Sequence, residues 1–179
     1  MELVAFRGAN WHFPEDTLPA FRRALQDGAS VLEMDLHLTK DGVIVVYHDS
    51  AWHGKKITKT RYESLASKVP SLEEVLVAFP TTKLSIKIRS KDLKAVYLTV
   101  DMIRKHQASS RVCLASYYLE VHRWLDDLGY EGERGLSYLE LLGVFLLPLA
   151  WLREFNLSGK RAQVPLKIGL LKFSSAYFV

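Results

Sequence analysis

Residues 31–49 read VLEMDLHLTKDGVIVVYHD, and this stretch decides the fold. Glu33 and Asp35 stand two residues apart, so in a strand both carboxylates leave one face while the apolar neighbours line the other. Residues 40–42 predict a turn, and the apolar run over 43–47 is typical of a strand buried on both faces, as in a parallel sheet. The stretch therefore predicts two buried strands, one of which carries a pair of carboxylates.

Outward from this stretch, short apolar runs alternate with segments of helical spacing. We expect further strands over residues 3–6, 84–89 and 111–115. We expect helices over residues 17–27, 71–79, 93–106 and 118–128, a largely helical segment at 136–155, and one or two weak strands in the tail. A chain in which strands and helices alternate in this way forms an α/β fold with parallel strands.

Length and composition limit the class of protein. The chain has 179 residues, of which 49% are hydrophobic and 25% charged, so it can bury the core of one domain. Its net charge is +4 and the charges are interspersed, which argues against nucleic-acid binding. Cys113 is the only cysteine, which excludes an intramolecular disulfide and a cysteine-based zinc site. The N-terminal residues lack the pattern of a signal peptide, so we expect a cytoplasmic protein.

The most apolar stretch is LSYLELLGVFLLPLAWL, residues 136–152. It is shorter than the roughly 20 residues that a membrane-spanning helix needs, and it contains Glu140 and Pro148. Two interpretations stay open. One is a buried or lid-like helix broken near Pro148, and the other is a surface that makes peripheral contact with lipid or with a partner.

Polar side chains stand at or near the ends of three successive strands. Arg7 follows the first strand, Glu33 and Asp35 lie on the second, and His48 and Asp49 follow the third. Carboxylates inside a sheet or barrel are costly unless a cation neutralises them, and Mg²⁺ or Ca²⁺ suits such oxygen ligands. Each residue has an ordinary structural role available, but strand ends are where α/β barrels place their sites. Together they indicate a functional site.

Five sequence blocks occur in an order and at spacings that together form a recognisable pattern. The first contains Phe-Arg-Gly-Ala from residue 6, then Pro-Glu-Asp-Thr-Leu and Ala-Phe, and is similar to the pattern HRG…PENTLxAF. The others are residues 32–42, 45–49, 70–76 and 84–89. In this order they resemble the glycerophosphodiester phosphodiesterase family, most clearly over the first half of the chain.

The resemblance implies a TIM-like (β/α) barrel that hydrolyses glycerophosphodiesters to an alcohol and glycerol 3-phosphate, an activity of lipid metabolism. It implies a divalent metal, Mg²⁺ or Ca²⁺, with Glu33 and Asp35 as ligands. Arg7 would contact phosphate, and His48 would be one of two acid/base histidines. Glu15 would be a supporting carboxylate nearby. This set agrees with the chemistry, because a cation and an arginine stabilise the charged transition state while a histidine transfers protons.

The sequence departs from the family at two positions that carry the family's chemistry. The family's other acid/base histidine falls on Phe6, which cannot transfer a proton, and its third acidic ligand falls on Lys87. If Lys87 faces inward, it repels a divalent cation and can pair with Glu33 and Asp35 itself, which leaves the site without a metal. Arg89 replaces the family's lysine and is suited to bidentate phosphate binding.

Two functional hypotheses follow. In the first, the chain is a glycerophosphodiester phosphodiesterase with an impaired site. In the second, it is a catalytically silent relative that binds phosphate-containing ligands, through Arg7, Arg89 and His48, or a partner. A complete (β/α)₈ barrel takes about 250 residues. We therefore expect residues 1–179 to form one domain with about six strands of eight, whose open edges a homo-oligomer would cover.

Overall fold

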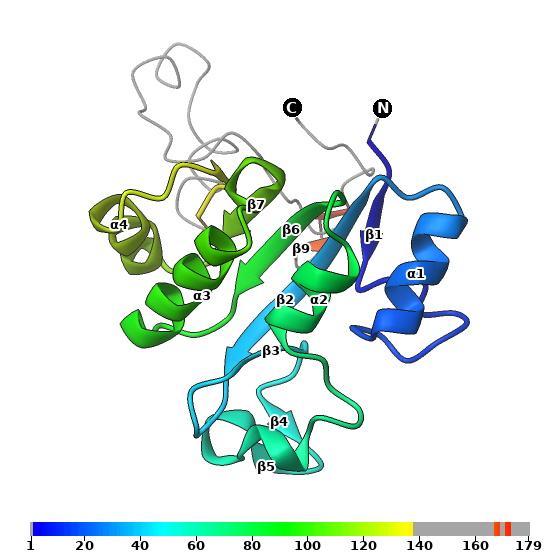
Figure 1. Cartoon of the computed structure of the whole chain (residues 1–179), viewed down its shortest axis with the longest axis horizontal. Coiled ribbons are helices and arrows are strands. Elements are labelled where there is room, and N and C mark those ends of the chain that lie inside the picture. Colours follow the sequence, from blue (N-terminus) through cyan, green and yellow to red (C-terminus); the bar gives the residue numbers. More distant parts are fainter. Residues whose placement is uncertain (1, 138–166, 169–170, 173–179) are drawn as a thin grey trace.

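The computed structural model describes residues 2–137, 167–168 and 171–172, and its elements alternate as expected for an α/β fold (Figure 1). The strands are β1 (Val4–Phe6), β2 (Val31–Leu38), β3 (Ile44–Val46), β4 (Ala51–Trp52), β5 (Lys55–Lys56), β6 (Lys83–Ile88), β7 (Val112–Ala115), β8 (Glu133–Arg134), β9 (Lys167–Ile168) and β10 (Leu171–Lys172). The helices are α1 (Leu18–Gln26), α2 (Leu72–Ala78), α3 (Leu93–Lys105) and α4 (Leu119–Asp127), with short 3-10 turns η1 (Ile57–Lys59), η2 (Tyr62–Ser64) and η3 (Ser109–Arg111).

The main sheet is mostly parallel. Its strands lie in the order β1-β2-β6-β7-β8, and each neighbouring pair along this path is parallel. Helix α1 connects β1 to β2, α3 connects β6 to β7, and α4 connects β7 to β8. Parallel neighbours need such crossovers, because the chain must return to the same end of the sheet. Over the described residues the sheet is open, with β1 and β8 at its edges.

Strand β3 differs from the prediction. It is fully buried, as expected, but it pairs with β2 in the antiparallel direction, Leu36 opposite Val46 and Leu38 opposite Ile44. The reason is the length of the connection. A tight turn around Gly42, which has φ +87°, joins the two strands, and so short a segment can only reverse the chain. The parallel orientation inferred from its apolar run is therefore wrong.

The helices begin where the sequence predicts. The Thr17 hydroxyl accepts a hydrogen bond from the Ala20 amide at the start of α1. At the start of α2, the Ser71 hydroxyl accepts from the Glu74 amide while the Glu74 carboxylate accepts from the Ser71 amide, a complete capping box. These bonds satisfy amide groups that the first helical turn leaves unpaired.

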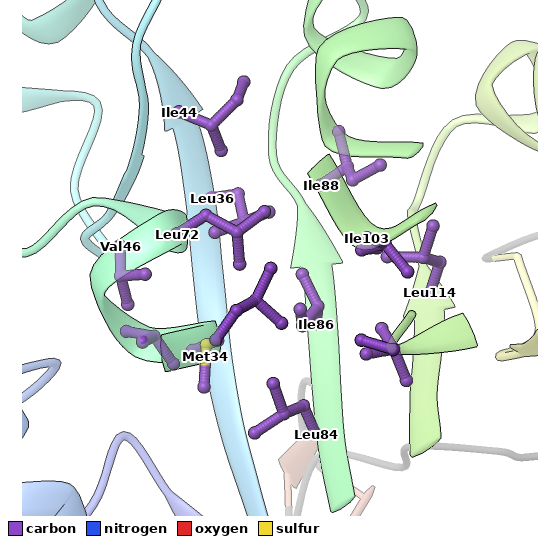
Figure 2. Close-up of a cluster of buried hydrophobic side chains, with 14 of the residues drawn as sticks. Met34, Leu36, Ile44, Val46, Leu72, Leu84, Ile86, Ile88, Ile103 and Leu114 are labelled. Carbon is purple, nitrogen blue, oxygen red and sulfur yellow. The ribbon is translucent and has the colours of Figure 1, made fainter. Parts of the chain in front are cut away.

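All four helices pack against one face of the main sheet. Figure 2 shows side chains from β2, β6 and β7, including Met34, Ile86 and Leu114, in contact with Leu72 of α2 and Ile103 of α3. These side chains are buried, and each contributes roughly 1.5–3 kcal/mol of hydrophobic free energy. The apolar side chains at every second position of these strands therefore form the core that stabilises the fold.

The strand residues that alternate with these apolar residues point to the other face of the sheet, where the charged groups lie. Glu33 and Asp35 alternate with Leu32, Met34 and Leu36 along β2. The carboxylates thus lie opposite the helical layer, on the face that would line a barrel.

Residues 138–166, which hold most of the apolar stretch at 136–152, lie outside the described part of the chain. Over the described residues, no helix has the length and apolar character to cross a membrane.

Candidate active site

Two carboxylates on β2 form the centre of the site. Glu33 is 1% exposed and Asp35 is 0% exposed. Glu33 lies opposite Phe6 of β1 and Ser85 of β6, and Asp35 lies opposite Lys87. Because these strands run parallel, their carboxyl ends meet at one edge and bring residues from three segments together.

The Lys87 ammonium pairs with one of these carboxylates. Its Nζ lies 3.3 Å from Oε1 of Glu33, and Lys87 itself is 9% exposed. Burial, with the nearby charge of Asp35, raises the pKa of Glu33 to about 7, although Lys87 and Arg7 act to lower it. Glu33 therefore changes its protonation state near neutral pH.

Two arginines flank the other carboxylate. Arg7 Nε lies 3.6 Å from Oδ2 of Asp35, and Arg89 Nε lies 3.7 Å from Oδ1. Arg7 Nη1 also donates to both oxygens of Glu15, at 3.1 and 3.3 Å. The distances to Asp35 are those of ion pairs longer than hydrogen bonds.

The backbone around Arg7 is strained in a way that places its side chain. Arg7 has φ +57°, and Gly8 after it has φ +79°. The Arg7 amide still donates to the Glu33 carbonyl at 3.1 Å, so the chain turns away only at the last rung of the β1–β2 ladder. A Cβ on Gly8 would lie 2.8 Å from the Ala20 carbonyl carbon, so only glycine fits there.

Two aromatic rings stand beside the cations. The Phe6 ring centre is 4.6 Å from Cζ of Arg7 and 5.9 Å from Nζ of Lys87. The Tyr117 ring centre is 5.5 Å from Nζ of Lys87 and 5.7 Å from Cζ of Arg89. Both rings are about half exposed, so they form an aromatic rim next to the charged groups.

His48 lies next to this cluster, just after β3. The Tyr47 amide donates to the Asp35 carbonyl at 3.0 Å, which ties the segment to β2. Nε2 of His37 donates to the His48 carbonyl at 3.1 Å, and burial lowers the pKa of His37. The ring of His48 contacts Asp49, with Nδ1 2.8 Å from Oδ1. A histidine whose Nδ1 is held by a carboxylate can exchange protons through Nε2.

Asp16 is a further buried carboxylate near the site. It is 1% exposed, its backbone has φ +58°, and neither carboxylate oxygen has a hydrogen-bond partner. Burial, together with the charges of Asp35, Glu33 and Glu15, raises its pKa to about 8. Asp16 is therefore mostly protonated at neutral pH.

The structure brings most of the predicted site residues together. Arg7 and Arg89 pair with Asp35, and Lys87 pairs with the neighbouring Glu33. His48 follows Tyr47, whose amide donates to the Asp35 carbonyl, and the His48 ring itself contacts Asp49. Three further residues near the site, Asp16, His37 and Tyr117, were not among the predicted site residues. The two-residue spacing that pairs Glu33 with Asp35 continues to His37, so this signal was available.

The donor set does not fit a divalent metal ion. Each of the two central carboxylates is paired with a cationic side chain. The Lys87 ammonium contacts Oε1 of Glu33, an oxygen that a metal would need as a ligand. In the described part of the chain, no group of three or more His, Cys, Asp or Glu residues is arranged to hold a metal. Hard cations require several free oxygen ligands, so a metal would have to displace these ion pairs.

A parallel sheet with helices on one face and charged groups at the carboxyl ends on the other defines a barrel-type α/β enzyme fold. The chain matches the model of the Glycerophosphoryl diester phosphodiesterase family over residues 7–129. It therefore belongs to this family, and its fold is the family's TIM-barrel fold, with no closed barrel over the described residues.

Individual relatives agree. A glycerophosphodiester phosphodiesterase from Caldanaerobacter subterraneus is 32% identical over 101 residues, covering 56% of this chain and 40% of that protein. The crystal structure of a glycerophosphodiester phosphodiesterase from Parabacteroides distasonis matches with a TM-score of 0.68 at 27% identity, covering 75% of this chain and 63% of that one. An Oleispira antarctica phosphodiesterase, solved with the product sn-glycerol-3-phosphate, matches with a TM-score of 0.70 at 21% identity, over 86% and 70%. The chain thus spans less than half the length of the curated relative.

Proposed function

We propose that this chain binds small phosphodiesters of the glycerophosphodiester type at the carboxyl edge of its sheet, and that its metal-dependent hydrolysis is strongly impaired. Arg7 and Arg89 are the phosphate contacts. The observation that carries the proposal is the 3.3 Å contact between Nζ of Lys87 and Oε1 of Glu33, which places an ammonium in a site of metal-ligand carboxylates.

Three cationic donors support phosphate binding. Arg7, Lys87 and Arg89 meet at this edge of the sheet, and the carboxylates of Glu15, Glu33 and Asp35 balance them, so the ionised cluster is neutral overall. Arginine forks match phosphate oxygens in a bidentate geometry, and aromatic rims next to cations accept the apolar part of an ester. The Oleispira antarctica relative was solved with its product sn-glycerol-3-phosphate, a phosphomonoester that is one half of a glycerophosphodiester.

The missing acid/base group supports the impairment. Phe6 occupies the family's second histidine position and has no proton to transfer. Losing one general acid or base costs roughly 10²–10⁴-fold in rate. In a metal-dependent mechanism the Lys87–Glu33 pair adds to this loss, because the carboxylate would have to leave its ammonium before binding a cation.

A second candidate is a working hydrolase, and the contact between His48 and Asp49 favours it. The carboxylate at 2.8 Å from Nδ1 would hold the imidazole in one orientation, as in other acid/base pairs. With one histidine so placed, an active enzyme would need another proton donor on the side of the leaving group.

The decisive experiment measures binding and hydrolysis together. Purified protein is titrated calorimetrically with sn-glycerol 3-phosphate, and hydrolysis of glycerophosphocholine is followed with Mg²⁺, with Ca²⁺ and with a chelator. We expect binding without appreciable turnover. Metal-dependent turnover by the unchanged protein would contradict the impairment and support the second candidate, and absence of binding would contradict the proposal as a whole.

A double variant tests the cause of the impairment. Phe6→His with Lys87→Glu restores both missing groups, and we expect its hydrolysis to rise by about 100-fold or more. The matched control is Val77→His with Lys55→Glu, which introduces the same two residues on the exposed surface of α2 and β5. An equal rate in the two double variants would refute the assignment of Phe6 and Lys87.

The proposal treats residues 1–179 as one domain with a small phosphodiester as its ligand. Peripheral membrane contact through residues 136–152, association of copies along the open sheet edges and a cytoplasmic location stay predictions from the sequence.

A further inference from the structure

Lys87 occupies the position from which a metal would act, and we infer that its ammonium is the resident cation of this site. Phosphate esters then bind here without any divalent metal, held by a charge that belongs to the chain itself. The ligand class rests on the proposed function. The identity of the cation rests on the geometry alone.

The Lys87 ammonium lies where a metal ion bound by these carboxylates would stand. Lys87 lies beside Asp35 in the parallel register of β2 and β6, and its Nζ is 3.3 Å from Oε1 of Glu33. A Ca²⁺ or Mg²⁺ ion bound by these carboxylates would stand about 2.0–2.6 Å from their oxygens. Such an ion and the ammonium would occupy nearly the same space with charges of the same sign.

The side chain of Lys87 is also held in place. Its side chain is 11% exposed. The rings of Phe6 and Tyr117 stand 5.9 and 5.5 Å from Nζ, and both attract the ammonium. Lysine can often move its charge to solvent along a flexible stem, but this ammonium would have to leave a buried carboxylate and two rings to do so.

The charge of the cluster also disfavours a divalent ion. With three cations against the carboxylates of Glu15, Glu33 and Asp35, the ionised cluster is already neutral before any ion binds. A divalent ion would raise its charge to +2 in a largely buried region, where repulsion is poorly screened. An ammonium has three donors, so Lys87 can donate to Glu33 and to a phosphate oxygen together.

The metal side of this inference is tested without any phosphate ligand. Binding of Mn²⁺ at pH 8 is measured by electron paramagnetic resonance for the unchanged protein, for Lys87→Glu and for Lys87→Met. Lys55→Glu is the matched control, because it makes the same charge reversal at an exposed position of β5. Thermal melts identify variants that fold.

We expect no saturable Mn²⁺ site stronger than about 1 mM in the unchanged protein and in Lys55→Glu. Lys87→Glu turns the cluster from neutral to −2, and we expect one Mn²⁺ site at least 10-fold stronger than in the control. Lys87→Met gives a cluster of −1 and an intermediate affinity, and it carries the test if Lys87→Glu does not fold. Saturable binding by the unchanged protein, or no gain in folded Lys87 variants, would overturn the inference.

The anion side uses sn-glycerol 3-phosphate with and without a chelator. We expect the same affinity in both conditions and a loss of about 10-fold or more in Lys87→Met, since a charge-assisted hydrogen bond contributes roughly 1.5–3 kcal/mol. Affinity that disappears with the chelator would overturn the inference. If no phosphate ester binds while the Mn²⁺ results are as expected, the proposed function fails and the resident cation stands.

Discussion

Replacing Asp16 by asparagine should stabilise the protein, and the gain should grow as pH rises from about 4 to about 8. Asp16 is 1% exposed, and neither of its carboxylate oxygens has a hydrogen-bond partner. Its φ of +58° lies in the left-handed region, which asparagine tolerates as well as aspartate does. The variant therefore keeps the shape and backbone of the residue and removes only its ability to ionise. Asparagine is also the residue at this position of the family pattern PENT.

The magnitude follows from the pKa. Burial raises the pKa of Asp16 from 3.8 to about 8, so between these values the folded protein holds a proton that the unfolded chain has lost. The free energy of unfolding therefore falls as pH rises through this window. A shift of about 4 units, at 1.36 kcal/mol per unit, destabilises the protein by up to about 5 kcal/mol at pH 8 relative to a neutral side chain. Near pH 4 the cost falls below about 1 kcal/mol.

Urea denaturation followed by tryptophan fluorescence at pH 5, 6.5 and 8 measures this effect. The stability gained by Asp16→Asn should grow steadily across the series. Asp101→Asn, an exchange on the exposed side of α3, is the matched control and should change stability equally at each pH. A gain that does not depend on pH would refute the reasoning, because it would mean that Asp16 is ionised in the folded protein.

Three other outcomes are expected. Arg89→Lys should weaken binding of sn-glycerol 3-phosphate by about 10-fold in calorimetry, because lysine cannot form the bidentate contact. Affinity of the unchanged protein for glycerophosphocholine, whose phosphodiester keeps the same charge between pH 6 and pH 8, should fall several-fold over this range, since Glu33, with a pKa raised to about 7, becomes negatively charged; a flat profile would contradict that assignment. Ile86→Ala, in the apolar layer, should lower the free energy of unfolding by about 2–5 kcal/mol in urea titrations. In the same variant, phosphate affinity at a temperature where the protein stays folded should change less than twofold.

Local patterns predicted most of the fold. Helix α1 begins at the N-cap Thr17 and α2 at the capping box of Ser71, because caps are decided by a few neighbouring residues. The direction of β3 depends instead on the length of the turn around Gly42. The apolar run showed that this strand is buried, and only the short connection shows that it reverses.

The site was predictable where it depends on alternation along a strand. The shared face of Glu33 and Asp35 follows from their spacing, and the inward position of Lys87 follows from the same rule. Asp16 was not predictable in this way, because its burial depends on a loop that folds back onto Arg7, where the Asp16 amide donates to the Arg7 carbonyl. Tyr117 is likewise brought to Lys87 only by the pairing of β6 with β7.

The two faces of the sheet also bear on how this chain could have diverged. Residues that decide whether β2 and β6 fold alternate with residues that decide what the site does, and each group lies on its own side. An exchange such as histidine to phenylalanine at position 6, or acid to lysine at position 87, alters the chemical side and leaves the packing against α2 and α3 intact. The stability of the fold and the chemistry of the site can therefore change independently, because they depend on alternate residues of the same strands.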